Sequence, residues 1–279
     1  MILFSPAKIN IGLRILRRRP DGFHDLQSLM YAVGLCDILE IRVEAEGESA
    51  LRFSQTGIPI PSGEGPNLVE RAWKLFSDRH PLPPLSIHLH KQIPIGAGLG
   101  GGSSNASTCL LGLNRLANEA MPKEQLLAMA AELGSDCPFF VQGGAMMMEG
   151  RGEKLREIPF SISEFQLVLL FPDIHISTAE AYAGVKAAMP ESHLEEVLRA
   201  APKEWKGRVV NDFEASLFPA HPILREIKDG LYNCGAVYAA MSGSGSAIYG
   251  LFDQSPDLPG ELEAFKVWEG PASLPNISS

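Results

Sequence analysis

Hydrophobic and polar residues alternate along several short stretches of the chain, as in strands that bury one face. The clearest stretch is Leu85–Lys91, in which a leucine or isoleucine precedes every serine or histidine. Strict alternation indicates a strand with one polar face. Comparable patterns predict strands at 1–16, 28–44, 85–93, 165–171, 235–241 and 246–252.

Apolar residues at spacings of three and four predict helices at 103–118, 123–133, from about 178, and at 222–232. Strands and helices in this order indicate an α+β protein, for which we expect mostly antiparallel pairing. Glycine and charge concentrate at Glu149–Glu153, so we expect two domains, 1–152 and 153–279. The segment after Asp253, rich in Pro, Gly and Ser, is expected to be a loosely held tail.

A glycine-rich segment precedes the helix predicted at 103–118. Glycines let the backbone approach a ligand closely, and a helix N-terminus offers unpaired N–H groups to anions, so the segment predicts a phosphate cradle. Ser103, Ser104 and Asn105 suit the helix start. The expected cradle residues are Pro94, Ile95, Gly96, Ala97, Gly98, Leu99, Gly100, Gly101, Gly102, Ser103 and Ser104.

Two familiar nucleotide-binding motifs fit this glycine-rich segment less well. Gly96, Gly98 and Gly101 satisfy G-x-G-x-x-G, but the preceding strand alternates, whereas the first strand of a dinucleotide-binding fold is apolar throughout. No G-K-[ST] follows the glycines, which excludes a Walker A loop. A glycine-rich surface loop without a ligand remains the plain alternative.

Two further segments favour the phosphate cradle over a surface loop without a ligand. Near the amino terminus, Lys8 and Asn10 alternate with isoleucines, so a strand would place both on one face. Late in the chain, Met241–Ser246 is a turn of small residues between two strand-like runs. Taken singly, the first could hold an ordinary exposed lysine and the second could be a tight hairpin.

Together these three segments read P-A-K-I-N, G-L-G-G-G-S-S and S-G-S-G-S, and in this combination the chain resembles the GHMP small-molecule kinases. Residues 19–26, 134–140 and 211–214 resemble the branch that acts on 4-diphosphocytidyl-2-C-methyl-D-erythritol, in the non-mevalonate route to isoprenoid precursors. The resemblance implies the two-domain GHMP kinase fold. Its N-terminal domain is ribosomal-protein-S5-domain-2-like and its C-terminal domain is ferredoxin-like.

The resemblance also implies ATP and Mg²⁺ as cofactors and assigns roles to residues. Lys8 and Asp136 would be catalytic, Asp136 as the base that takes the proton of the attacking hydroxyl; its plain alternative is a helix cap or turn aspartate. A hydroxyl of Ser103 or Ser104 could touch the metal, and the sequence leaves the metal ligands open. The implied substrate-binding residues are Asn10, Phe23, His24, Thr178, Tyr182 and Gly243. For Phe23, where the family often has tyrosine, and for Tyr182, ordinary core packing is the alternative.

Composition narrows the classes of partner. A net charge of −9 argues against general nucleic-acid binding, and no apolar stretch is long enough for a membrane span. Four dispersed cysteines fit reduced thiols in the cytoplasm. His88 and His90 would share a strand face, more often a surface pair than a metal site. Arg14 and Arg17–Arg19 predict a solvated strand end or, alternatively, a patch that attracts an anionic substrate.

We therefore expect an ATP-dependent kinase for this small-molecule substrate, without nucleic-acid or membrane partners, as a monomer or weak homodimer. One alternative is another GHMP kinase, acting on homoserine, mevalonate or a sugar. A second is a non-catalytic nucleotide-binding regulator, against which the intact Lys8 and Asp136 argue.

Overall fold

The computed structural model describes residues 1–45, 49–61 and 65–274. By internal contacts the chain forms two compact units. Unit 1 comprises Met1–Ala7, Leu35–Ile95 and Gly100–Gly143, and unit 2 comprises Lys8–Gly34, Gly96–Leu99 and Gly144–Ser279. The chain therefore enters each unit more than once, and strands β1 (Ile2–Arg18) and β2 (His24–Val43) contribute residues to both. The domain boundary at residue 152 stays a prediction.

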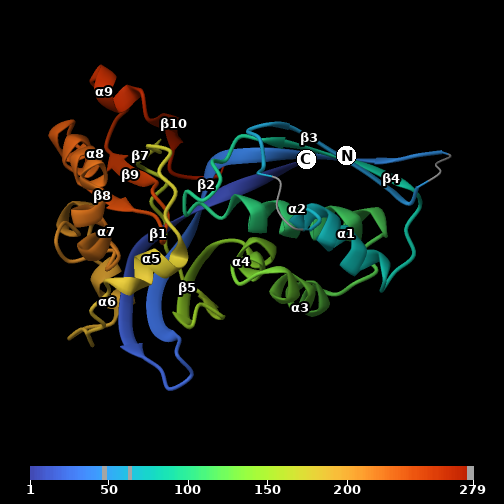
Figure 1. Cartoon of the computed structure of the whole chain (residues 1–279), viewed down its shortest axis with the longest axis horizontal. Helices are drawn as coiled ribbons and strands as arrows, with labels where there is room; N and C mark the ends of the chain where they lie inside the picture. The colour runs from blue at the N-terminus through green and yellow to red at the C-terminus, as the bar shows by residue number, and fades with distance from the viewer. Residues whose placement is uncertain (46–48, 62–64, 275–279) are drawn as a thin grey trace. The chain divides into compact units, whose positions relative to one another are not determined.

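Unit 1 is a sheet covered on one face by helices, as Figure 1 shows for α1 and α2. Strand β4 (Leu85–Lys91) pairs antiparallel with β2 and parallel with β3 (Leu51–Gly57). Leu85, Ile87 and Leu89 lie in the core, as the alternation predicts. The helices are α1 (Leu68–Ser77), α2 (Gly101–Leu116), α3 (Lys123–Leu133) and α4 (Cys137–Gln142).

Local sequence explains helix α1, which the periodicity analysis missed. Asn67 accepts a hydrogen bond from the N–H of Val69 (2.9 Å), and Glu70 accepts one from the N–H of Asn67 (2.8 Å). This reciprocal capping box satisfies two N–H groups of the first turn. The helix is ten residues long, and Val69, Ala72 and Phe76 fasten it to the core.

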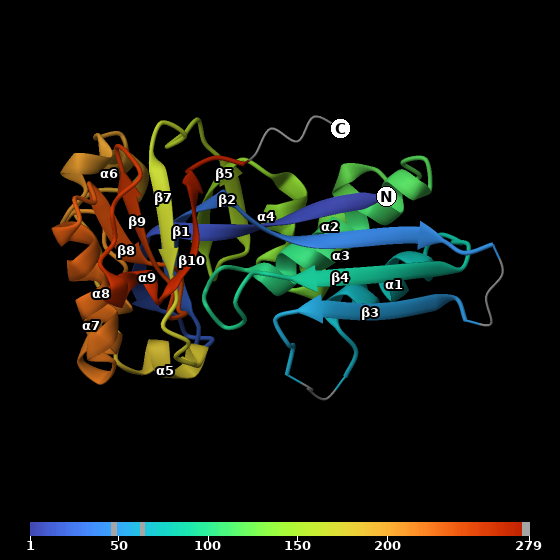
Figure 2. The same cartoon turned by 90° about the horizontal axis from the view of Figure 1, so that it is seen from above.

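Unit 2 contains a second sheet, which Figure 2 shows with α6, α7 and α8 beside it. Its strand order is β10-β7-β9-β8, with every neighbouring pair antiparallel. In addition, the first part of β2 pairs antiparallel with β5, and β5 with β6. The strands are β5 (Ala145–Gly150), β6 (Lys154–Glu157), β7 (Gln166–Leu170), β8 (Tyr238–Met241), β9 (Ile248–Phe252) and β10 (Lys266–Pro271).

Short helices complete unit 2. The longest, α8, buries Leu224, Ile227 and Leu231 at spacings of three and four, as predicted. The helices are α5 (Thr178–Ala183), α6 (Leu194–Leu198), the 3₁₀ helix η1 (Pro202–Glu204), α7 (Glu214–Ala220), α8 (Pro222–Asn233) and α9 (Gly260–Glu263). No helix of the described residues is long and apolar enough to cross a membrane.

One expectation needs correction, and the segment of the expected domain boundary has a defined local structure. The segment after Asp253 is not a loose tail up to residue 274, because α9 and β10 form there and β10 pairs with β7. The charged glycine segment at 149–153 is the turn of the β5–β6 hairpin, with Arg151 donating its N–H to Glu153 Oε2 (2.5 Å). The predicted α+β class and the mostly antiparallel pairing are confirmed among the described strands, with β3–β4 as the parallel pair.

Candidate active site

Lys8 is a buried lysine held by oxygen atoms of unit 2. It lies on β1 with only 5% of its surface exposed, between Ala7 and Ile9, which are fully buried. Its Nζ donates hydrogen bonds to Asn10 Oδ1 (2.5 Å) and to the carbonyl oxygen of Gly98 (2.8 Å). Burying an ammonium costs free energy unless hydrogen bonds compensate it. Lys8 is thus fixed beside the glycine segment, and the alternative of an ordinary exposed lysine is wrong.

Asn10 is oriented by its own partners. Its Nδ2 donates to Ser28 Oγ (2.8 Å), and that hydroxyl donates to the carbonyl oxygen of Gly12 (2.6 Å). Tyr249 donates its hydroxyl to the Asn10 carbonyl oxygen (3.0 Å). With Nδ2 engaged by Ser28, Oδ1 is the atom left to face Lys8. Ser28 and Tyr249 are buried supports that the sequence analysis did not single out.

The first part of the glycine segment interlocks with the late glycine turn. Gly98 has φ +82°, and a Cβ there would lie 2.1 Å from the carbonyl oxygen of Ser242. A Cβ on Gly245 would lie 2.2 Å from the nitrogen of Gly98. Ser242 Oγ donates to the Gly98 carbonyl oxygen (3.1 Å). The N–H of Ala247 donates to the carbonyl oxygen of Ala97 (3.1 Å). Both segments therefore require glycine, because each backbone occupies the space of the other's side chains.

The second part of the segment starts helix α2 in unit 1. Gly100, at φ +72°, is the N-cap, so the helix begins at Gly101 and not at the serines. Ser103 lies in its first turn, whose N–H groups have no partners within the helix. The N–H of Ser104 donates to the carbonyl oxygen of Gly100 (2.9 Å). Ser104 Oγ is fully buried and has no hydrogen-bond partner. An orphaned buried hydroxyl at a helix start is suited to a ligand atom.

A buried ion pair supports this helix start from within unit 1. Lys91 Nζ donates to Asp37 Oδ2 (2.5 Å), which also accepts from Asn105 Nδ2 (2.8 Å). Asp37 Oδ1 accepts from the N–H groups of Gln92 and Ile93. Burial lowers the pKa of Lys91, and the Asp37 charge opposes that shift. A Cβ on Gly101 would lie 2.9 Å from Lys91 Nζ, so this pair touches the first residue of α2.

Removing one member of this pair is expected to destabilise the fold. Lys91→Met leaves the Asp37 carboxylate fully buried without its cation. Loss of one partner of a buried pair costs about 3 kcal/mol or more, so the urea midpoint is expected to fall accordingly. Asp37→Leu combined with Lys91→Met removes both charges and is expected to recover part of the loss. A single variant within about 0.5 kcal/mol of the parent protein would contradict this role of the pair.

Asp136 is the N-cap residue of α4 in unit 1, at φ −84° and ψ −14°, and its side chain makes no capping hydrogen bond. Helix α4 is tied to α2 by Ser107 Oγ, which donates to the carbonyl oxygen of Cys137 (2.8 Å). This hydrogen bond fixes the first residue of α4, and with it the neighbouring Asp136, relative to α2. The alternative of a helix-cap aspartate agrees with the position of Asp136 before α4. It does not agree with the side chain, which forms no capping hydrogen bond. Since Lys8 belongs to unit 2, the joint action of Lys8 and Asp136 stays a prediction.

The residues expected to bind the cytidine lie in unit 2. Phe23 is 57% exposed, so it is not a core residue, and the guanidinium of Arg151 lies 5.0 Å from its ring centroid. The rings of His24 and Tyr182 stack with centroids 5.1 Å apart. Tyr182 is half-buried and forms a T-shaped pair with Phe213, with ring centroids 4.9 Å apart. Burial raises the pKa of Tyr182. Thr178 is exposed at the start of α5.

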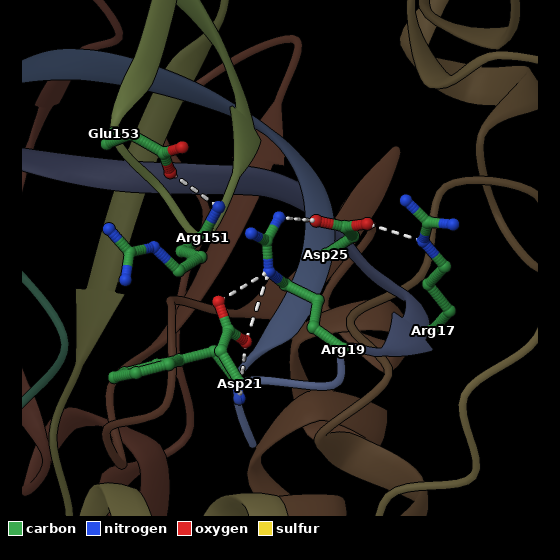
Figure 3. Close-up of polar contacts among 7 residues, drawn as sticks. Arg17, Arg19, Asp21, Asp25, Arg151 and Glu153 are labelled. Atoms are coloured by element: carbon green, nitrogen blue, oxygen red, sulfur yellow. Dashed lines mark hydrogen bonds and ion pairs between the residues drawn. The ribbon is translucent and has the colours of Figure 1, made fainter.

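Ion pairs hold the turn that carries Phe23, as Figure 3 shows. Arg19 bridges Asp21 and Asp25, at 3.1 and 2.8 Å, and Arg17 pairs with Asp25 at 2.5 Å. Arg19 also donates its N–H to the carbonyl oxygen of Phe23 (2.7 Å). The charges of Arg17 and Arg19 are therefore paired with nearby carboxylates. The role of the basic run in attracting substrate stays a prediction.

Arg14 departs from the predicted solvated strand end. It is buried and donates to the carbonyl oxygens of Ser192 (2.8 Å) and Arg208 (3.3 Å). Burial lowers the pKa of this guanidinium, although Asp212 acts in the opposite direction. Arg14 is thus a structural residue of unit 2.

The other candidate ligands form no metal site. His88 and His90 share a face of β4 and both contact Thr56 Oγ1 at 3.0 Å. Across the described residues there is no group of three or more His, Cys, Asp or Glu that could hold a metal ion. The four cysteines are free, and burial raises the pKa of Cys36 to about 11 and of Cys109 to about 12. The thiols of Cys36 and Cys109 are therefore poor ligands and poor nucleophiles at neutral pH.

Comparison with known proteins identifies the family of this chain. Residues 67–144 match the GHMP kinases N terminal domain, and residues 185–265 match the GHMP kinases C terminal domain. A 4-diphosphocytidyl-2-C-methyl-D-erythritol kinase of Parabacteroides distasonis is 43% identical over 98% of this chain and 100% of its own length. The one from Bacteroides thetaiotaomicron is 44% identical over 93% and 94%. The chain belongs to the 4-diphosphocytidyl-2-C-methyl-D-erythritol kinase family of GHMP kinases.

Solved structures agree with this membership. A crystal structure of 4-(cytidine 5'-diphospho)-2C-methyl-D-erythritol kinase matches with a TM-score of 0.80 and 33% identity, over 97% of this chain and 98% of the other. A homoserine kinase from Cytophaga hutchinsonii matches at 0.60 with 18% identity, over 90% and 85%, and so shares the fold alone. The two-domain GHMP kinase fold predicted for this family member is confirmed, and it is an ATP-dependent kinase fold.

The structure also identifies buried residues beside the site that the sequence analysis missed. Asn211 is 2% exposed, and its Nδ2 donates to the carbonyl oxygens of Met241 and Gly243. Glu214 Oε1 accepts from the N–H of Met241. The only signal for them was N-D-F-E at 211–214, which served as a mark of resemblance without a role.

Proposed function

We propose that this chain transfers the γ-phosphoryl group of ATP to the 2-hydroxyl of 4-diphosphocytidyl-2-C-methyl-D-erythritol, in the non-mevalonate route to isoprenoid precursors. The observation that carries the proposal is the match to kinases of this name over nearly the whole chain. The buried Lys8–Asn10–Gly98 cluster supports it, because a fixed ammonium beside a glycine segment suits phosphoryl transfer.

In this proposal the glycine segment holds the phosphates. The N–H groups from Gly98 to Ser103 donate to the β- and γ-phosphate oxygens, and the positive end of the α2 dipole favours their charge. Pro94–Ala97 precede them and line the nucleotide side. The conformations of Gly98 and Gly100 support this role, since both have positive φ, which residues with a Cβ rarely adopt.

Mg²⁺ fits this segment as an ion carried mainly by the phosphates. Mg²⁺ commonly keeps waters and takes one or two protein ligands besides phosphate oxygens, so a protein cage is not required. The orphaned Ser104 hydroxyl and the neighbouring Ser103 hydroxyl are the candidate protein ligands. When bound, the ion neutralises charge on the phosphates.

The reacting groups are assigned as follows. The substrate 2-hydroxyl oxygen attacks the γ-phosphorus, the bond from that phosphorus to the bridging oxygen breaks, and ADP leaves. Asp136 accepts the hydroxyl proton, which is the task of a general base. Lys8, through its ammonium, stabilises the negative charge that develops on the attacking oxygen and the transferred group.

Substrate recognition is assigned to unit 2. Asn10 and Gly243 adjoin Lys8 and would face the erythritol and its diphosphate, since a Cβ on Gly243 would lie 3.4 Å from Lys8 Nζ. His24 and Tyr182 form a stacked pair, to which Thr178 and the exposed ring of Phe23 add a cytidine-binding surface. Phenylalanine offers a stacking face without the hydroxyl contact of a tyrosine.

A coupled ADP-release assay tests the proposal. We expect ATP-dependent turnover with 4-diphosphocytidyl-2-C-methyl-D-erythritol and roughly 10³-fold lower kcat/KM with homoserine, mevalonate or galactose, because these lack the cytidine diphosphate contacts. Turnover with one of the latter alone would refute the assignment. ATP binding without turnover of any acceptor would favour the regulatory alternative.

The remaining assignments belong to the same proposal. Domains 1–152 and 153–279 would correspond to the nucleotide-binding and substrate domains of the family. The enzyme would act in the cytoplasm on a small molecule, as a monomer or weak homodimer, without nucleic-acid or membrane partners. Sedimentation velocity at micromolar concentration tests the oligomeric state.

A further inference from the structure

The turn at Met241–Gly243 is fastened by two side chains of the 211–214 segment. Asn211 Nδ2 donates to the carbonyl oxygens of Met241 (2.9 Å) and Gly243 (2.8 Å). Glu214 Oε1 accepts from the N–H of Met241 (2.9 Å), and its Oε2 accepts from Lys228 Nζ (2.5 Å). Two buried polar side chains thus hold the backbone on both sides of Ser242.

The orientation of Asn211 is itself determined. Its Oδ1 accepts from the N–H of Phe213 (3.0 Å), so Nδ2 must face the two carbonyl oxygens. Its backbone neighbours pair with β1, since Leu13 donates its N–H to Val210 and accepts from the N–H of Asp212, both at 2.8 Å. Asn211 therefore connects β1, the strand that carries Lys8, to the Met241–Gly243 turn in a fixed orientation.

The turn in turn contacts the atoms around Lys8. Ser242 Oγ donates to the Gly98 carbonyl oxygen (3.1 Å), which also accepts from Lys8 Nζ (2.8 Å). A Cβ on Gly243 would lie 3.2 Å from Asn10 Oδ1 and 3.4 Å from Lys8 Nζ. A displacement of the turn by a few tenths of an ångström therefore changes the acceptor and the free space of the ammonium.

We infer that Asn211 and Glu214 are positioning residues: by fixing the Met241–Gly243 turn against Gly98 and Lys8, they set the location of the Lys8 ammonium for phosphoryl transfer. The inference rests on the proposed function, in which Lys8 acts on the reacting groups. Small misplacements of such groups lower kcat by up to about 10²-fold.

Asn211→Asp tests this role with almost no change in size. Its carboxylate would face two carbonyl oxygens without a proton to donate, so we expect kcat at pH 8.5 to fall about 10²-fold with little change in KM for ATP. Burial favours the neutral carboxyl, which donates one hydrogen bond. The ratio of variant to wild-type kcat is therefore expected to rise about tenfold or more as the pH falls from 8.5 to 6.

Asn114→Asp is the matched control. Asn114 is a buried asparagine of α2 whose Nδ2 donates to the carbonyl oxygen of Met121 (3.0 Å) and whose Oδ1 accepts from the Met121 N–H (2.9 Å). It has the same atoms and a similar loss of hydrogen bonding, without contact to the turn. Its kcat ratio to wild type is expected to stay within about threefold and to be independent of pH.

A second variant and a second measurement cover the case that Asn211→Asp does not fold. Ser242→Ala removes the hydroxyl that donates to Gly98 and accepts from the N–H of Asn10 (3.3 Å), and we expect kcat to fall about tenfold at unchanged KM for ATP. Hydrogen exchange without substrate is expected to be about tenfold faster at the Ser242 and Ala247 amides of Asn211→Asp than in wild type.

Unchanged exchange at these amides, or a kcat ratio of Asn211→Asp that is flat with pH and equal to that of Asn114→Asp, would overturn the inference. If Asn211→Asp does not fold, unchanged kcat in Ser242→Ala would overturn it. Failure of the proposed function is distinguishable, because wild-type protein would then release no ADP with the cytidine-linked substrate. Exchange would still decide whether Asn211 holds the turn.

Discussion

Asp136→Asn is expected to lower kcat roughly 10³-fold while ATP still binds, since loss of a general base costs about 10²–10⁴-fold. The amide keeps the size of the carboxyl but cannot take the hydroxyl proton. The side chain makes no capping hydrogen bond at the start of α4, so the change removes no helix cap. Steady-state kinetics, together with calorimetric titration of ATP, would measure both effects.

The matched control is Asp229→Asn, at an exposed aspartate of α8. It makes the same chemical change away from the proposed site and is expected to leave kcat and stability nearly unchanged. A kcat of Asp136→Asn within threefold of wild type would remove Asp136 from the mechanism.

Gly243→Val is expected to reduce kcat roughly 10²-fold or more, with a smaller effect on stability. Gly243 has φ +60°, which costs about 1–2 kcal/mol for a residue with a Cβ. Its Cβ would also lie 3.2 Å from Asn10 Oδ1 and 3.4 Å from Lys8 Nζ, and the two methyl groups of valine extend further into that space. Occupation of the space next to the ammonium should therefore block turnover.

Gly207→Val separates the backbone cost from the clash. Gly207 also has positive φ, at +77°, but nothing lies within 4 Å of its added Cβ. We expect a similar fall in Tm for both variants and normal kcat for Gly207→Val alone. Wild-type turnover in Gly243→Val would mean that the turn is only a hairpin.

Periodicity predicted the elements whose faces differ clearly. In β4 and α8 the apolar residues recur at spacings of two and of three and four, and these residues are the buried ones. The same reasoning placed Lys8 and Asn10 on one face of a strand, where they hydrogen bond each other. Local pattern is sufficient where a single strand or helix decides which side chains meet.

Elements that depend on distant partners were missed. Strand β10 lies in a segment rich in Pro and Gly, and it forms because it pairs with β7, about a hundred residues earlier. Trp268 packs there against Gly34, where a Cβ would lie 2.7 Å from its ring. Composition indicated a loose tail, but long-range pairing and the contact between Trp268 and Gly34 outweighed it.

The buried residues that support the site could not be identified from the sequence either. Asp37, Lys91 and Asn211 are ordinary polar residues in the sequence, and only the fold makes them buried partners of the glycine segments. Gly98 was predicted to serve a ligand, yet it also makes room for the backbone of the late glycine turn. Phe23 was a candidate for the core and is exposed. A single sequence does not specify which segments approach one another.

The most direct test of the account is a crystal structure of the chain with 4-diphosphocytidyl-2-C-methyl-D-erythritol, Mg²⁺ and a non-hydrolysable ATP analogue. We expect the amides of Gly98–Ser103 to hold the phosphates, with Lys8 Nζ and an Asp136 carboxylate oxygen each about 3 Å from the 2-hydroxyl oxygen. A triphosphate bound away from this segment, or a 2-hydroxyl beyond the reach of both side chains, would contradict the account.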